Sequence, residues 1–122
     1  MLKLLSLLKN EINDNEIVSV MNFVGLDPFS KTSYKHYSTG MKQKLKIAQA
    51  LMEKPKVLIL DEPFNGLDED SVKMFRQKFL EMNGEGITLI ITSHYKENID
   101  ELCNRVYRMN NGELEEYEND FL

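Results

Sequence analysis

Two short runs of β-branched and apolar residues constrain the fold of this chain more than any other feature. Residues 57–60 are continuously apolar, residues 87–92 are β-branched or apolar with threonine at 88 and 92, and a stretch with helical periodicity separates the two runs. Continuous apolar runs of this kind are typical of parallel strands that are buried on both faces of their sheet. Strands that alternate with helices indicate an α/β fold with a parallel sheet. We therefore expect both strands to be covered on both faces.

Helices are predicted before, between and after these strands, because apolar side chains recur there at helical spacing. We expect one helix over the first residues, a second capped by Asn13, a third that begins at Ser38, a fourth capped by Asp68, and a short fifth helix. Two strands that turn at Asn111-Gly112 are predicted to close the chain as a hairpin. The residues expected to face inward in the first four helices are Met1, Leu4, Leu5, Leu8, Ile17, Val20, Met21, Val24, Met41, Leu45, Ala48, Met52, Val72, Phe75, Phe79 and Met82.

Composition limits the classes of function. The chain has 122 residues, 42% of them hydrophobic and 29% charged, which is typical of one soluble globular unit. Its net charge of -5 does not suit a protein that grips nucleic-acid phosphates, so we expect no nucleic-acid partner. Cys103 is the one cysteine, which excludes a disulfide within the chain, and we expect it to be a small buried apolar side chain. No apolar run approaches the ~20 residues that a membrane-spanning helix needs.

Polar residues with chemical potential follow both strands. Asp61-Glu62 comes after the first and Ser93-His94 after the second, and ligands of parallel α/β sheets bind at the carboxyl ends of strands. Adjacent carboxylates beside a buried strand need a partner, because burying unpaired charge is costly. A Mg²⁺ ion held by Asp61 and a general base at Glu62 would provide one. The alternative is an exposed acidic turn before Pro63.

Four motifs then occur in order: YSTGMKQKLKIAQAL, VLILDEP, NGLD and ITSHY. Their sequence and spacing resemble the ATPase subunits of ABC transporters, and most of all those of bacterial multidrug and antibiotic exporters. The resemblance covers almost the whole chain. It implies an α/β fold that is a partial P-loop NTPase domain. Residues 1–54 would form a helical subdomain with the signature motif, and residues 55–122 the C-terminal part of the ATPase core, ending in a β-hairpin.

The family's signature, usually LSGGQ, falls on YSTGM at residues 37–41. The resemblance implies that Ser38 and Gly40 contact the γ-phosphate of a nucleotide held by the opposite subunit. A helix N-terminus suits this role, because its free N–H groups and dipole attract phosphate. Thr39 and Met41 depart from the family's usual Gly and Gln. The alternative is that Ser38 only caps its helix.

The remaining motifs imply further site residues. His94 matches the family's switch histidine, which senses the γ-phosphate, although a histidine at a strand end can also be purely structural. Asn65, Gly66 and Asp68 match the D-loop, where two subunits touch across the dimer. Asp68 is also a good helix cap, and both of its roles can hold together. The resemblance assigns Asp61 and Glu62 the same metal and base roles that the strand pattern suggested.

The resemblance implies an ATP-hydrolysing subunit with ATP and Mg²⁺ as cofactors. Its partners would be a transmembrane permease subunit and a second ATPase subunit in a head-to-tail dimer. It would lie in the cytoplasm, peripheral on the inner face of the cell membrane. One alternative is a non-catalytic remnant or interaction module that docks on a permease. Another is a soluble ABC-type ATPase that acts on ribosomes or chromosomes, but the tandem domains and coiled coils of such proteins do not occur in this sequence.

The phosphate-binding pattern G-x-x-x-x-G-K-[ST] does not occur in the 122 residues. We therefore expect the sequence to begin inside the helical subdomain and to be unable to build a complete ATP site by itself. The family's sheet takes strands from both halves of the domain. The chain alone is accordingly expected to expose a sheet edge and an apolar sheet face, and to be marginally stable or to associate.

Overall fold

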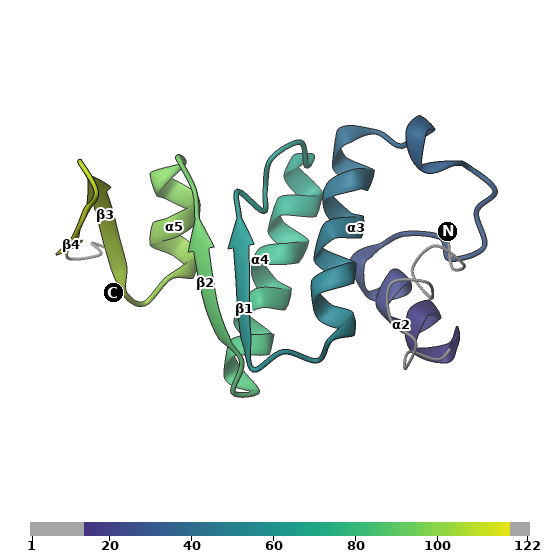
Figure 1. Ribbon diagram of the computed structural model, residues 1–122, viewed down its shortest axis with the longest axis horizontal. Coiled ribbons are helices and arrows are strands. Elements are labelled where there is room, and N and C mark those ends of the chain that lie inside the picture. The colour runs from purple at the N-terminus through teal and green to yellow at the C-terminus, as the bar shows by residue number, and fades with distance from the viewer. Residues whose placement is uncertain (1–13, 118–122) are drawn as a thin grey trace.

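The computed structural model describes residues 14–117, in which helices come first, strands and helices then alternate, and a hairpin follows (Figure 1). The predicted first helix and the Asn13 cap lie outside this range. None of the described helices is long and apolar enough to cross a lipid bilayer. The elements are α2 (Asp14–Val24), the 3₁₀ turn η1 (Tyr34–His36), α3 (Thr39–Met52), β1 (Val57–Asp61), α4 (Glu69–Gly84), β2 (Thr88–Thr92), α5 (Lys96–Leu102), β3 (Val106–Asn110) and β4 (Glu113–Tyr117).

The strands β1 and β2 pair in parallel, with Val57 opposite Thr88 and Asp61 opposite Thr92. The helix α4 connects them, so the strand–helix–strand order read from the sequence is confirmed. Both strands end at the same edge of the sheet, and α3, α4 and α5 begin there (Figure 1). Five elements therefore begin or end at this edge, and ligands of parallel α/β sheets bind at the carboxyl ends of the strands.

The prediction that both strands are buried on both faces is wrong. Leu58 and Leu60 are only 2% and 6% exposed, whereas Val57 and Ile59, on the opposite face of β1, are 51% and 68% exposed. Ile90 of β2 continues that open face. The described helices cover one face only, so an alternating burial pattern replaces the expected continuous one. The expectation of an exposed apolar sheet face is confirmed.

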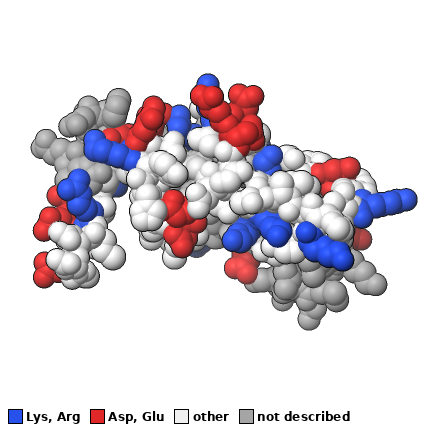
Figure 2. Space-filling model, turned by 90° about the horizontal axis from the view of Figure 1, so that it is seen from above, with Lys and Arg blue, Asp and Glu red and all other residues white. Residues whose placement is uncertain are grey.

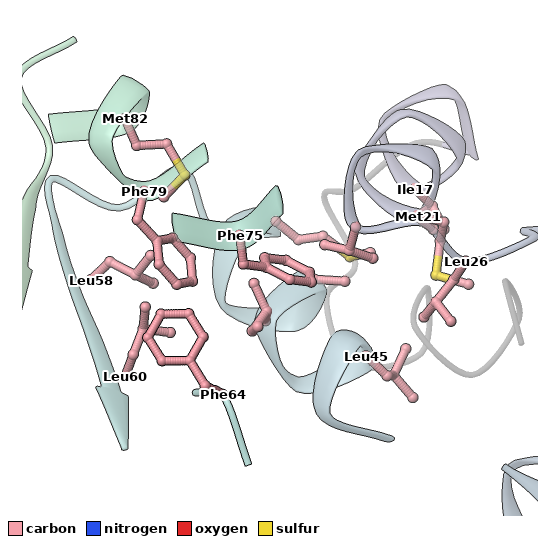
Figure 3. Close-up of a cluster of buried hydrophobic side chains, with 14 residues drawn as sticks. Ile17, Met21, Leu26, Leu45, Leu58, Leu60, Phe64, Phe75, Phe79 and Met82 are labelled. Atoms are coloured by element: carbon pink, nitrogen blue, oxygen red, sulfur yellow. The ribbon is translucent and has the colours of Figure 1, made fainter. Parts of the chain in front are cut away.

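The covered face packs into one hydrophobic cluster with α2, α3 and α4 (Figure 3). Phe75 and Phe79 of α4 are fully buried with ring centroids 5.8 Å apart, and Phe64 lies 5.9 Å from Phe79. Ile17 and Met21 carry the cluster into α2. Each such side chain contributes about 1.5–3 kcal/mol when it leaves water. The predicted boundary between a helical subdomain and an ATPase core crosses this cluster and stays a prediction.

Local sequence signals fix the element ends. Ser38 caps α3, where its Oγ accepts the amide N–H of Met41 at 3.1 Å. The predicted hairpin is confirmed, since β3 and β4 pair in antiparallel fashion. Its turn residues Asn111 and Gly112 both have positive φ, at 51° and 79°, as the tight turn of an Asn-Gly hairpin requires.

Candidate functional site

Asp61 and Thr92 meet at the carboxyl end of the parallel strand pair. They are register partners, and the Thr92 hydroxyl donates a hydrogen bond to Oδ1 of Asp61 at 2.5 Å. This bond orients the carboxylate on the open face of the sheet, where Asp61 is exposed. Asp61, which is predicted to hold a metal, is therefore accessible, and the hydrogen bond from Thr92 fixes the orientation of its carboxylate.

Glu62 and His94 lie together beside this pair. Nε2 of His94 is 3.3 Å from Oε1 of Glu62, and the two residues come from the ends of different strands. The Glu62 side chain is 22% exposed, whereas His94 is 94% exposed. The two residues predicted to be catalytic are thus neighbours, and the imidazole faces solvent, where a ligand can reach it.

The backbone of Glu62 has a positive φ of 49°, which is uncommon for a residue with a side chain. Such a conformation costs about 1–3 kcal/mol and persists only where the surroundings impose it. Here the Glu62 amide donates to the Thr92 carbonyl at 3.0 Å. The main-chain carbonyl of Glu62 accepts two hydrogen bonds, one from the backbone N–H of Asn65 at 3.2 Å and one from Nε2 of Gln43 at 2.9 Å.

Gln43 is the residue of this arrangement that sequence reasoning missed. It lies in α3, 19 positions before Glu62, and it is partly buried. In the sequence it stands among lysines on the polar side of a helix, between Lys42 and Lys44. Helical periodicity places such a residue on a solvated face, so no local signal marks its contact.

The start of α3 lies against the loop that precedes α4. A Cβ atom added to Gly40 would meet the carbonyl oxygen of Gly66 at 2.8 Å. Gly66 has a φ of 75°, and a Cβ there would meet Cγ2 of Thr39 at 2.5 Å. Both positions therefore need glycine. The predicted signature and D-loop residues are brought together within one chain.

Asp68 caps α4, as predicted. Its carboxylate accepts the amide N–H of Ser71 at 3.3 Å and the Ser71 hydroxyl at 2.5 Å. These bonds, led by the one from the hydroxyl, lower the pKa of Asp68. Asn65 is exposed in the loop between Glu62 and Asp68. A contact of Asn65, Gly66 or Asp68 with a second subunit stays a prediction.

The whole edge combines features that suit a phosphate ester with its metal ion. The N-termini of α3 and α4 point to the same edge as the carboxyl ends of β1 and β2 (Figure 1), and helix N-termini attract phosphate. Figure 2 views the molecule from this edge, where basic and acidic side chains stand in small separate groups. Residues 14–117 contain no cluster of three or more potential metal ligands. Mg²⁺ needs none, because it is held by one or two carboxylates together with substrate phosphates.

Cys103 is only partly buried, so the prediction of a buried side chain needs correction. It lies at the C-terminal end of α5, where less of the core covers it. Burial first, and the charge of Asp100 second, raise the pKa of its thiol. A raised pKa disfavours the reactive thiolate, so Cys103 does not have the character of a nucleophile.

Residues 2–65 match the family described as ABC transporter. The chain belongs to the ABC transporter family. It is 46% identical over 114 residues to the ABC transporter ATP-binding protein YybJ of Bacillus subtilis, covering 93% of this chain and 52% of that protein. It is 34% identical over 116 residues to the bacitracin transport ATP-binding protein BcrA of Enterococcus faecalis, covering 94% and 38%. This ABC family chain spans about half the length, or less, of the curated relatives it matches.

Solved ABC structures have the same fold. An ATP-binding cassette of an ABC transporter in its ADP conformation matches with a TM-score of 0.68 and 25% identity, over 83% of this chain and 40% of that one. A putative metal-chelate type ABC transporter in an inward-facing conformation matches with a TM-score of 0.73 at 20% identity, over 87% and 43%. The predicted partial P-loop NTPase fold is therefore confirmed.

Proposed function

We propose that this chain forms part of the ATP-hydrolysing unit of an ABC exporter. The observation that carries the proposal is the cluster of Asp61, Glu62 and His94 at the edge where the parallel strands end, with 3.3 Å between Glu62 and His94. Membership of the ABC transporter family supports it. Residues 1–54 would be the helical subdomain and residues 55–122 part of the ATPase core.

Each residue of the cluster has one task in this proposal. When bound, ATP supplies the phosphoryl group that passes to water, and Mg²⁺ offsets its charge. Asp61, oriented by the Thr92 hydroxyl, would hold the metal with a carboxylate oxygen. Glu62 accepts a proton from the attacking water as general base. His94, exposed with its Nε2 3.3 Å from Oε1 of Glu62, would orient that carboxylate and would contact the terminal phosphate.

The 122 residues contain no G-x-x-x-x-G-K-[ST] pattern, so another part of the ATP-hydrolysing unit would supply the phosphate-binding loop. Ser38 and Gly40, at the N-terminus of α3, would contact the nucleotide of a second subunit in a head-to-tail dimer. Asn65, Gly66 and Asp68 would lie at the interface of that dimer. Such a dimer would work beneath a transmembrane permease, on the cytoplasmic face of the membrane.

The names of several relatives support export of an antibiotic. They include proteins described as bacitracin transport, lantibiotic transport and linearmycin resistance ATP-binding proteins, from Enterococcus faecalis, Streptococcus pyogenes and Bacillus subtilis. A permease sets the identity of a transported substrate. The proposal for this chain is therefore limited to the class of antibiotic-export ATPases.

A chimera tests the proposed base. It joins the part of YybJ that this chain does not cover to the chain itself, so that one polypeptide spans the length of an ABC ATP-binding protein. Glu62→Gln should lower ATP turnover by about 10²–10⁴-fold, because Gln keeps the shape but takes no proton from water. ATP binding should persist, and an ATP-bound dimer should accumulate.

The matched control is Glu85→Gln, which changes an exposed carboxylate at the opposite end of α4. Its turnover should equal that of the parent chimera. Turnover of Glu62→Gln within a few-fold of the parent would show that Glu62 is not the base. A parent chimera that folds and binds ATP without hydrolysing it would favour a non-catalytic module instead.

A further inference from the structure

We propose that Gln43 is a positioning residue for hydrolysis, which holds the main-chain carbonyl of Glu62 and thereby aims the Glu62 carboxylate. The inference rests on the proposed role of Glu62 as general base. Gln43 itself touches the backbone and not the reacting atoms. It therefore acts through Glu62.

Three elements fix the peptide groups of Glu62. The strand β2 accepts its N–H at the Thr92 carbonyl, 3.0 Å away. The following loop donates the Asn65 N–H to the Glu62 carbonyl at 3.2 Å. The helix α3 donates Nε2 of Gln43 to the same carbonyl at 2.9 Å. A carbonyl oxygen has two lone pairs, so both acceptor positions are used.

This clamp accounts for the positive φ of Glu62. A residue with a Cβ atom leaves the left-handed region unless its neighbours impose it. The Asn65 bond is local, spanning three residues, and a relaxed turn can keep it. The Gln43 bond comes from another element and ties the carbonyl to the position of α3. Loss of the Gln43 bond removes the one restraint on the Glu62 carbonyl that does not depend on the turn. Rotation about the N–Cα bond of Glu62 then moves its carboxylate away from His94.

The helix α3 is a firm support for this bond. Its first turn is in close contact with the loop that follows Glu62, since Gly40 and Gly66 leave no room for a Cβ between them. Leu45 and Ala48 of the same helix are buried in the core. Gln43 therefore reaches Glu62 from an element that packing holds in place.

The test uses the chimera and measures kcat, KM and the fraction of ATP-bound dimer. Gln43→Met keeps the side-chain length but removes the donor. We expect kcat to fall at least tenfold with KM within twofold of the parent, because small misplacements of a reacting group cost up to about 10²-fold. An ATP-bound dimer should accumulate, as for Glu62→Gln. Gln43→Lys restores a donor and should recover most of the lost kcat.

Two comparisons separate positioning from a general effect on structure. Gln49→Met makes the same change six residues later in α3 and should leave kcat unchanged. In a Glu62→Gln background, adding Gln43→Met should change the residual rate less than twofold, since two residues that act through one group are not additive. If Gln43→Met does not fold, Gln43→Glu keeps the shape and removes the donor at neutral pH, and it should show the same loss of kcat.

Two results would overturn the proposal. One is a folded Gln43→Met or Gln43→Glu chimera whose kcat stays within twofold of the parent. The other is a loss of rate in the Glu62→Gln background as large as that in the parent. Failure of the proposed function has a different signature, because Glu62→Gln alone would then retain the parental turnover.

Discussion

The carboxylate of Asp68 accepts two hydrogen bonds from Ser71, and its pKa in the folded chain lies below the value of 3.8 expected for a free side chain. A group with a depressed folded pKa stabilises the native state above its unfolded pKa. That contribution is lost as pH falls through the folded pKa. Asp68 therefore stabilises the start of α4 across the whole neutral and mildly acidic range.

Replacement of Asp68 tests this cap. Asp68→Ala should lower the urea midpoint of the chimera, because the amide of Ser71 loses its acceptor. The difference from the parent should stay constant between about pH 7 and pH 5 and shrink only below the unfolded pKa. Asp68→Asn, which keeps an acceptor oxygen, should retain much of the parental midpoint. A difference that vanishes by about pH 6 would mean that another group titrates in its place.

At the scale of elements, α4 is the helix that joins the sheet to the rest of the core. Phe75 and Phe79 face β1 and α3 from one stripe of this helix, as the periodicity predicted (Figure 3). Phe75 has no exposed surface. Its removal would leave a cavity between elements that cannot easily close.

Phe75→Ala should therefore lower the free energy of unfolding of the chimera by about 3–5 kcal/mol. Urea unfolding followed by circular dichroism measures this change. Phe29→Ala is the control, because the Phe29 side chain is 71% exposed, and it should change the free energy by less than about 0.5 kcal/mol. Equal effects of the two substitutions would contradict the assignment of Phe75 to the core.

The elements were predictable where their signals are local. Ser38 and Asp68 cap their helices as expected, and Asn111-Gly112 turns the hairpin, because caps and tight turns depend on a few neighbouring residues. The burial of β1 was mispredicted, since Ile59 is apolar whether or not another layer covers it. Whether a face of a strand is buried depends on which other elements pack against it. The residues of the strand alone do not reveal this.

The candidate site divides in the same way. The positions of Asp61, Glu62 and His94 at the carboxyl ends of β1 and β2 could be predicted, because each lies within two residues of the end of an apolar run. The positive φ of Glu62 and its bond to Gln43 could not. Both depend on contacts between elements, and neither leaves a periodic trace in the sequence.

At the scale of the whole molecule, the described part leaves one face of its parallel sheet open. Val57, Ile59 and Ile90 form an exposed apolar stripe on that face. Exposed apolar patches of this kind mark surfaces that other protein covers. In the chimera the added part of YybJ would provide such a cover, and for this reason the quantitative tests use the chimera rather than the 122 residues alone.

The dimer proposal makes a prediction at this scale. Ser38→Arg should leave ATP binding to a single chimera intact but abolish dimerisation and hydrolysis, because a long cation would fill the approach to the partner's nucleotide. Mixing this variant with a chimera whose phosphate-loop lysine is replaced should restore some ATPase activity. One composite site then has both elements intact and the other has both damaged.

Activity in that mixture requires that one intact site suffices for turnover. The proportion of heterodimer, measured by native mass spectrometry, provides the control. A Ser38→Arg chimera that no longer binds ATP as a monomer would contradict action across the dimer. A fully formed heterodimer with no activity would contradict it as well, provided that one intact site suffices for turnover. A covalently linked dimer with one damaged site tests that condition.

The contact between Thr39 and Gly66 also limits how this lineage can change. Cγ2 of Thr39 occupies the space that a side chain at position 66 would need, and the φ of 75° at Gly66 independently disfavours any such side chain. A side chain at position 66 is thus excluded twice, once by the Cγ2 methyl of Thr39 and once by the backbone conformation, so shortening residue 39 alone would not make room for one.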